Sequence, residues 1–360
     1  MKSGIDNTDK NVDFILSEKN KDKQSLLGDF DKFLQPQIFK EYQKRIPFQQ
    51  NWSKYNLSQQ HEMPIFIEYL NNLLDSLEVR EVSSLGRPRL LLRDIIFCSV
   101  FNIYTTVPTR KINSYLQNIK KDGLIKVVPS FSTIRRYLRK ESLSDKLIFL
   151  IEESSKILKN YETTFAVDST GFSSLKFNRW NVDRLQGRKH RRDFKKCHIC
   201  VGVKSGIVTA IKVTRGYDAD TTFFRELINT TKTNGFNILE VVADKGYHSK
   251  DNYELVNSIG ALPFIPFKSN STGKSRGSYY YAKMYREQKD NPEYFYNHYH
   301  QRSIVESVFS AIKRKFLDYT RAKSDIGRNN EIFLKILAYN ICILVRCVYF
   351  RDKIFDDDKF

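Results

Sequence analysis

The sequence has few cysteines and no long uninterrupted apolar run. Its five cysteines form an odd set at irregular spacing in a chain of 360 residues, which argues against a disulfide-stapled secreted fold and predicts a reducing cytoplasm. Residues 1–23 contain no apolar core of a signal peptide. The most apolar stretch, Ile332–Phe350, is interrupted by Lys335, Asn340 and Arg346, which favours a buried helix over a membrane span.

Metal-binding cysteines are also scarce. Cys197 and Cys200 form a Cys-x-x-Cys pair, a spacing that is also found in zinc sites. A structural zinc site needs four ligands, and the other close pair, Cys342 and Cys347, lies in the apolar helical stretch. A lone pair of ligands is a weak signal, so we expect no zinc site.

Acidic residues are outnumbered, with 41 Asp and Glu against 60 Lys and Arg, and the formal charge is +19. The 26 Phe and 20 Tyr supply enough apolar surface to exclude a wholly disordered chain. So basic a protein is typical of a partner of polyanions, nucleic acid first among them. The excess is concentrated in residues 121–140, 176–196, 268–286 and 302–328, and the remainder of the chain is nearly neutral.

The composition changes along the chain and predicts a division into parts. Residues 1–30 form a loose polar tail, 31–160 a helical region, 161–350 an α/β domain, and 351–360 a second polar tail. Within the α/β domain, residues 268–298 form a Gly-, Ser-, Lys- and Tyr-rich excursion before two final helices. No internal repeat is visible.

The helical region contains one candidate DNA reader. Apolar residues from Phe66 to Leu77 follow a 3.6-residue period, and Pro129–Lys140 reads as a capped helix with one basic face. That face carries Arg135, Arg136 and Arg139, as a helix-turn-helix reader requires. A solvated face on a bundle helix explains the pattern equally well.

Five β-rich segments and two intervening helical segments follow residue 161. We expect a mixed sheet with helices on its faces, with strands at Thr163–Ser169, Cys197–Gly206, Ile207–Thr214, Leu239–Ala243 and Ala261–Phe267. Asp220 is expected to cap the helix that follows the third strand, and a second helix spans about residues 250–258.

Three acidic residues stand out by position. Asp168 is expected to end the first strand and Asp244 the fourth, while Glu306 lies on a later helix. The carboxyl ends of such strands meet at one edge of a sheet, where open sheets bind ligands. Carboxylates gathered there repel one another, and Mg²⁺ or Mn²⁺ relieves that repulsion because both ions prefer oxygen ligands.

The helix with Glu306 is the most specific feature. Tyr299, Arg302, Glu306 and Lys313 have the spacing Tyr-x2-Arg-x3-Glu-x6-Lys, which places them within an arc of about 60° on one helix. This arrangement suits a metal ligand flanked by groups that hold phosphates. Alone, it would more often be an ordinary surface ladder of i, i+4 ion pairs.

These motifs, in this order, resemble those of the DDE transposases of bacterial and archaeal insertion sequences, and the strand order resembles their ribonuclease-H-like core. The resemblance covers Thr163 to Val348 and includes the family's Lys-x-His segment at Lys196. Lys245, within Asp-x-Gly-Tyr, departs from the small residue that is more familiar there, and we expect its side chain to point at DNA.

The resemblance implies phosphoryl transfer with two Mg²⁺ or Mn²⁺ ions. Asp168 would bridge the ions, Asp244 and Glu306 would each hold one, and Arg302, Lys313 and Tyr299 would contact DNA. The partners it implies are double-stranded DNA, both inverted repeats and target, and a second copy of the chain in a homodimer. A prokaryotic cytoplasmic, nucleoid-associated location follows, with no membrane or small-molecule partner.

A basic loop at residues 176–196 adds a second DNA-contact prediction. It holds nine Lys or Arg against two Asp, and cations can follow a DNA backbone while an aromatic ring stacks on an unpaired base. A flexible solvated hairpin whose Trp covers a core edge is the alternative. The candidate contacts are Trp180, Arg188, Lys189, Arg191, Arg192 and Lys196.

Two other functions fit the same sequence features. One is a non-catalytic DNA-binding protein descended from such an enzyme. The other is a ribonuclease-H-like nuclease that cuts DNA without joining it. A transposase accounts for all the motifs together and is the function that the sequence predicts.

Overall fold

The computed structural model describes residues 51–77, 90–174, 194–274 and 278–350. The chain divides into two compact units, Met1–Ser53 with Asp356–Phe360, and Lys54–Phe355. The second unit contains every strand and every site described below.

All described elements before the sheet are helices: α2 (Trp52–Gln60), α3 (Glu62–Asp75), α4 (Leu92–Thr105), α5 (Ile112–Lys121), α6 (Phe131–Tyr137) and α7 (Glu141–Lys156). Helix α3 buries Phe66, Leu70 and Leu74, the periodic positions of the sequence. Helix α6 begins after Ser130, whose side chain accepts a hydrogen bond from the Thr133 amide as a cap should. The described part of the N-terminal region is therefore all-α, as predicted.

A five-stranded mixed sheet follows, with the order β3-β2-β1-β4-β5. Strands β1, β2 and β3 are antiparallel neighbours, whereas β4 and β5 run parallel to β1. Gly206 lies in the turn between β2 and β3 with φ 81°, a conformation that glycine adopts without strain. The strands are β1 (Thr164–Ser173), β2 (Phe194–Gly202), β3 (Val208–Arg215), β4 (Glu240–Ala243) and β5 (Leu262–Phe264).

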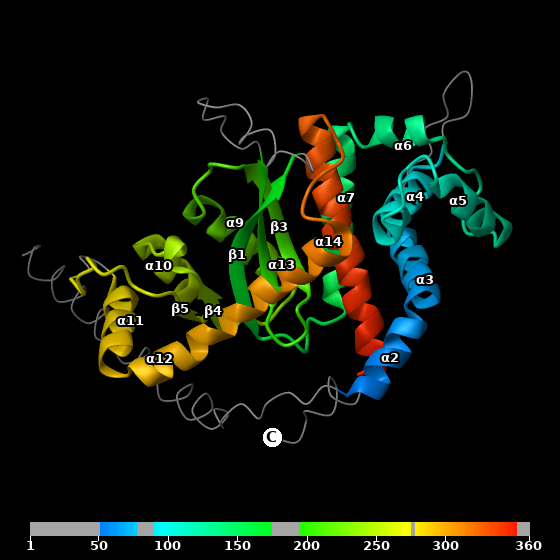
Figure 1. Cartoon of the computed structure of the whole chain (residues 1–360). Helices are drawn as coiled ribbons and strands as arrows, with labels where there is room; N and C mark the ends of the chain where they lie inside the picture. Colours follow the sequence, from blue (N-terminus) through cyan, green and yellow to red (C-terminus); the bar gives the residue numbers. More distant parts are fainter. Residues whose placement is uncertain (1–50, 78–89, 175–193, 275–277, 351–360) are drawn as a thin grey trace, which may run out of the picture. The chain divides into compact units, whose positions relative to one another are not determined.

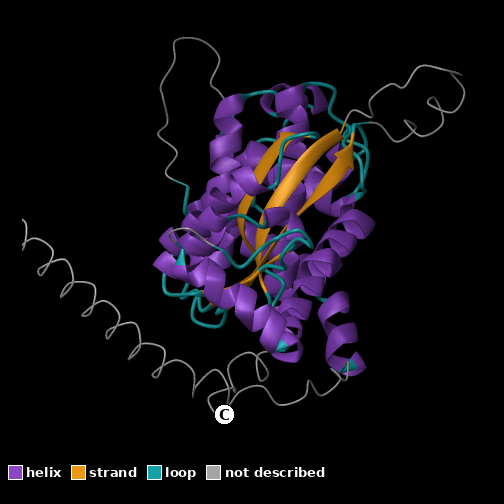
Figure 2. Ribbon diagram, turned by 90° about the vertical axis from the view of Figure 1, so that its left-hand side faces the viewer, coloured by secondary structure: helices purple, strands orange, loops and turns teal. Residues whose placement is uncertain are grey.

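Helices cover both faces of the sheet. Figure 1 shows α9 (Thr221–Thr233) and α10 (Lys250–Ser258) on one side, and α7 and α14 (Asp325–Tyr349) on the other, and Figure 2 shows the strands enclosed between helices. Helix α13 (Ser303–Phe316) packs on β1. The predicted α/β fold is thus confirmed: a ribonuclease-H-like mixed sheet with helices on its faces.

Helix α14 is a core helix. It is long and apolar enough to cross a membrane, yet 78% of its most apolar window is buried inside the fold. Two of the polar residues that interrupt it, Lys335 and Asn340, are buried and hydrogen-bonded. Asn340 accepts a hydrogen bond from the Val208 amide (3.0 Å) and donates to the carbonyls of Val208 (2.8 Å) and Ile151 (3.3 Å). One amide side chain therefore fixes α14 to both β3 and α7.

Two findings concern the chain near the signature, and the second corrects a prediction. The excursion at residues 268–298 contains two helices, α11 (Tyr279–Asp290) and α12 (Pro292–Tyr299), because Ser278 caps the first and Pro292 opens the second. The signature is also not one continuous α-helix, since a 3₁₀ turn, His300–Arg302, separates α12 from α13.

Candidate active site

Asp168 lies in the middle of β1, not at its end as predicted. The strand continues to Ser173 because its antiparallel pairing with β2 extends that far, and Asp168 lies opposite Ile199. The parallel pairing with β4, however, ends at Val167 and Ala243. Asp168 and Asp244 therefore follow the last paired residues of two neighbouring parallel strands, at the edge where open sheets bind ligands.

Arg302 connects Asp168 to Glu306. Its guanidinium donates to Asp168 Oδ2 (2.8 Å) and to Glu306 Oε1 (2.5 Å). The Tyr299 hydroxyl, on the preceding turn, donates to Asp244 Oδ1 (3.4 Å). The Arg302 and Tyr299 side chains thus hold the signature segment against the edge of the sheet. Their partners, Asp168 and Asp244, are 134 and 55 positions away in sequence.

The electrostatics of Asp168 reflect its partial burial. Burial raises the pKa of this carboxyl, and the charges of Asp244 and Glu306 raise it further, while the Ser169 amide and Arg302 oppose them. The Ser169 amide donates to Asp168 Oδ1 at 2.8 Å. The effect of Asp244 and Glu306 places the three carboxylates within electrostatic reach of one another.

The three acids are a donor set suited to divalent ions. Their ligand atoms are carboxylate oxygens, which Mg²⁺ and Mn²⁺ prefer, and a cationic group already lies between Asp168 and Glu306. Within the described ranges, no three His, Cys, Asp or Glu side chains are close enough to hold one ion together. The donor chemistry of the three acids therefore suits divalent ions, although their side chains do not form a preassembled three-ligand site in the described residues.

Lys313 lies further along the same helix face and contacts β1. Its ammonium donates to Thr170 Oγ1 (2.6 Å) and lies 5.5 Å from the centre of the Phe172 ring. Burial lowers the pKa of this lysine, although Asp318 opposes the effect. Lys313 is thus held two residues along β1 from Asp168, with its cation directed at the strand.

Asp220 does not cap α9, which corrects the sequence prediction. It has helical backbone angles and no capping hydrogen bond. Its carboxylate instead accepts from Ser169 Oγ (2.7 Å) and pairs with Lys196 Nζ (2.7 Å). A fourth acid therefore lies beside β1, close to Asp168, and no local pattern in the sequence indicated it.

His198 belongs to the same cluster. It is fully buried on β2, with Nδ1 3.3 Å from Asp220 Oδ1 and Nε2 3.0 Å from Thr214 Oγ1. Burial lowers its pKa to about 4, so the ring is neutral at pH 7. His248 lies apart from this cluster, 3.3 Å from the Tyr281 hydroxyl.

An ion pair to a buried carboxylate joins the signature helix to the helical region. Lys315 Nζ lies 2.5 Å from Glu62 Oε1, which also accepts a hydrogen bond from the Tyr104 hydroxyl (2.9 Å). Glu62 is almost fully buried. Helices α3, α4 and α13 therefore meet at one carboxylate, a link that the sequence did not predict.

The other predicted DNA contacts divide into three groups. Lys245 and the α6 arginines are exposed, whereas Lys196 is paired with Asp220. Cys197 and Cys200 are buried in β2 beside Lys196, as free thiols. Five predicted contacts lie outside the described residues: Trp180, Arg188, Lys189, Arg191 and Arg192.

The fold and the site together define a ribonuclease-H-like α/β protein with a carboxylate cluster at the carboxyl edge of its sheet. The profile of the family described as "Transposase DDE domain" matches residues 160–341. This match covers half of the chain, and the chain belongs to that family. Its members generally use divalent metal ions and act on DNA.

One curated relative supports the same family. The chain is similar to the protein described as "Probable transposase for insertion sequence element ISA1214" from Archaeoglobus fulgidus. The two are 21% identical over 310 residues, which cover 85% of this chain and 90% of the relative. The similarity therefore extends beyond the catalytic domain into the N-terminal helical region.

Proposed function

We propose that this protein is a DNA transposase that binds the terminal inverted repeats of its insertion sequence and catalyses metal-dependent cleavage and strand transfer. The observation that carries the proposal is the bridge from Asp168 through Arg302 to Glu306, which joins the sheet edge to the signature helix. The family and the relative's description support the same activity.

Asp168, Asp244 and Glu306 are the proposed metal ligands, with Asp168 shared between two Mg²⁺ or Mn²⁺ ions. When bound, such ions activate an attacking oxygen and stabilise the leaving oxygen of an in-line displacement. The Asp168 carboxylate favours a cation at this edge because burial leaves its charge poorly solvated.

The neighbouring side chains position DNA in this proposal. Arg302 presents a planar guanidinium suited to two phosphate oxygens, and it can exchange its carboxylate partners for a phosphate once cations occupy the acids. Lys313 supplies a second positive charge beside β1. Tyr299 presents a half-buried ring that can pack against a sugar or displaced base.

The wider organisation is also proposed. Residues 31–160 form a DNA-binding region and 161–350 the catalytic domain, between tails at 1–30 and 351–360. Two element ends must react in one complex, so the active form is a homodimer on double-stranded DNA in the prokaryotic nucleoid. Lys245, which is exposed, is a further proposed DNA contact.

Amide substitution of the first two acids tests the function. Asp168→Asn and Asp244→Asn should abolish Mg²⁺-dependent nicking of a duplex with the element's inverted repeat, while its binding survives. Asp251→Asn changes an exposed acid in the first turn of α10 that is not a proposed ligand, so it is the matched control and should nick normally. Nicking retained by either of the first two variants would overturn that residue's role.

A further inference from the structure

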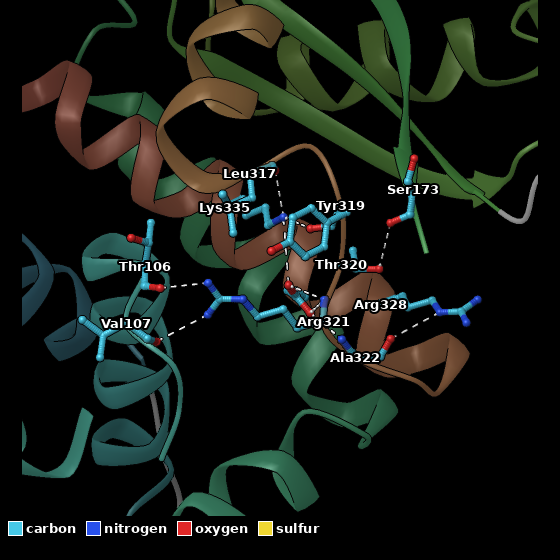
Figure 3. Close-up of polar contacts among 11 residues, drawn as sticks. Thr106, Val107, Ser173, Leu317, Tyr319, Thr320, Arg321, Ala322, Arg328 and Lys335 are labelled. Atoms are coloured by element: carbon cyan, nitrogen blue, oxygen red, sulfur yellow. Dashed lines mark hydrogen bonds and ion pairs between the residues drawn. The ribbon is translucent and has the colours of Figure 1, made fainter. Parts of the chain in front are cut away.

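The loop that connects α13 to α14 is fastened to the catalytic strand. The Ser173 amide donates to the Asp318 carbonyl (3.1 Å), and the Thr320 amide donates back to the Ser173 carbonyl (2.8 Å). Ser173 and Tyr319 form an isolated parallel bridge, and Figure 3 shows Ser173 beside Thr320. The loop is therefore held directly against the end of the strand that carries Asp168.

Helix α14 holds the same loop from its other side. The buried Lys335 ammonium donates to the carbonyls of Leu317 (3.0 Å) and Tyr319 (2.6 Å), as Figure 3 shows. Leu317 has φ 72°, a conformation that costs a bulky residue about 1–3 kcal/mol. Glu331, 5% exposed, accepts from the amides of Arg321 (2.9 and 2.8 Å) and Ala322 (2.8 Å). These contacts give the loop one defined shape.

Arg321 extends this framework to the helical region. Its guanidinium donates to the carbonyls of Thr106 (2.8 Å) and Val107 (3.4 Å), at the end of α4 (Figure 3). Carbonyl partners satisfy the hydrogen bonds of the guanidinium but leave its positive charge uncompensated. The loop thus brings a cation to a place where catalytic and N-terminal segments meet.

A cavity of about 610 Å³ opens at this meeting place, lined by α4, α6, the loop after α13 and the start of α14. Five basic residues line it: Arg110, Arg135, Arg139, Arg321 and Lys323. All five are exposed. Its single acidic lining residue is Glu331, which lies 4.0 Å from the buried Lys335 ammonium and so has a cation of its own. We call this cavity the basic groove.

The cations of the basic groove are not neutralised by nearby acids. In the part of the chain that the structure describes, no ion pair joins any of the five to a carboxylate. Arg110 lies over the Phe131 ring at 5.2 Å, a contact that orients it without removing its charge. Five uncompensated cations on one concave surface make a site for a polyanion.

We propose that the basic groove binds the sugar-phosphate backbone of the DNA that is cut at the carboxylate edge. This inference rests on the proposed function and adds a second, separate contact to it. From Glu306 to Phe316, its last residue, α13 advances about 15 Å, the length of roughly four base pairs of duplex. The groove thus lies beyond the end of α13 that is distant from Glu306.

The groove contacts explain how a strand is held in register with the active site. One loop connects the groove to β1 and α13, the elements that carry Asp168 and Glu306. A phosphate held by Arg135 and Lys323 is therefore at a fixed distance from both acids. Phosphate contacts of this kind set orientation rather than sequence preference.

Salt-dependent binding tests the proposal with the full-length protein. The double variant Arg135→Gln, Lys323→Gln should bind a labelled duplex with the inverted repeat more weakly. The slope of log affinity against log salt should fall by about two, since each lost phosphate contact removes roughly 0.9. The charge-conserving variant Arg135→Lys, Lys323→Arg should keep the wild-type slope.

A matched control separates the groove from general charge. Arg225→Gln, Lys232→Gln removes two exposed cations from α9, on the opposite side of the sheet from α14, and should leave the slope unchanged.

The outcomes are decisive in either direction. Equal slopes for the groove variant and the wild type would overturn the proposal, as would equal losses in the groove and α9 variants. Either result would leave the carboxylate function intact, because Asp168→Asn would still abolish nicking. Conversely, nicking by Asp168→Asn together with a reduced slope in the groove variant would overturn the catalytic assignment and keep the groove.

Discussion

The two ends of α13 carry similar cations but pair them differently. At its start, Arg302 is bonded to two carboxylates. In the loop beyond its end, Arg321 is bonded only to carbonyls and Lys323 has no carboxylate partner among the described residues. The first end can position acids and metals, and the second keeps its charge for an anion. Net charge alone does not distinguish these roles, but pairing does.

The acids at the two ends give the largest contrast. Glu306 is 59% exposed in its side chain, while Glu331 is 7% exposed and accepts three hydrogen bonds from loop amides. We expect Glu306→Gln to reduce nicking by a thousandfold or more, an effect on the order of other catalytic-group deletions, with unchanged thermal stability. Glu331→Gln should retain nicking but lower the unfolding free energy by about 1–3 kcal/mol. Single-turnover nicking and denaturant unfolding measure both; a reversed pattern would contradict the division.

The buried link between the helical region and α13 should have the next largest effect. Lys315→Met leaves the nearly buried Glu62 carboxylate without its cation, which should cost about 3 kcal/mol of unfolding free energy. Lys212→Met is the matched control, because its pair with Glu226 is exposed on both sides and contributes under about 1 kcal/mol. Equal losses in denaturant unfolding would show that burial does not distinguish the two pairs.

Arg302 is expected to oppose cation binding while it contributes to DNA binding. Arg302→Ala removes the positive charge between Asp168 and Glu306, so Mn²⁺ should bind about tenfold more tightly, even though nicking falls. Calorimetric titration without DNA measures the first effect. Arg302→Lys should lie between the wild type and Arg302→Ala. Weaker Mn²⁺ binding by the alanine variant would contradict the competition.

The smallest predicted effect is a pH dependence of stability. It comes from Lys335 on α14, which holds the loop beyond the end of α13. Burial lowers the pKa of Lys335 from its usual 10.5 to about 8. Between these values the unfolded chain binds a proton that the folded protein lacks, so the unfolding free energy rises with pH. Relative to Lys335→Met, the unfolding free energy of the wild type should rise by about 1 kcal/mol per pH unit. Urea unfolding at pH 8 and 10 measures this rise. No difference in slope between the two proteins would contradict it.

Local patterns in the sequence predicted the fold class and the candidate acids. Asp168 and Asp244 follow apolar β-rich runs, and the spacing from Arg302 to Glu306 is a helix property. Both depend on neighbours within a few residues. Reliance on local patterns also produced the error at Asp168. Antiparallel pairing with β2 extends β1 beyond Asp168, and no residue near Asp168 in the sequence indicates this pairing.

Long-range pairing accounts for what the sequence could not predict. Glu62 and Lys315 meet across 253 positions, and Arg321 reaches Val107 across 214. A carboxylate such as Asp220 has good capping chemistry, yet it turns to Ser169 and Lys196 because the fold brings them closer. Tertiary packing determines which partner a polar side chain contacts, and the local spacing of residues does not predict that packing.

Strand transfer from precut ends tests the central claim most directly. The wild-type protein with Mg²⁺ should join the 3′-hydroxyl of a precut inverted-repeat duplex to a target plasmid, and Asp168→Asn should not. Product from the wild type alone is the predicted result. Nicking of uncut ends by the wild type without any joined product from precut ends would contradict the account and identify a nuclease that cuts without joining.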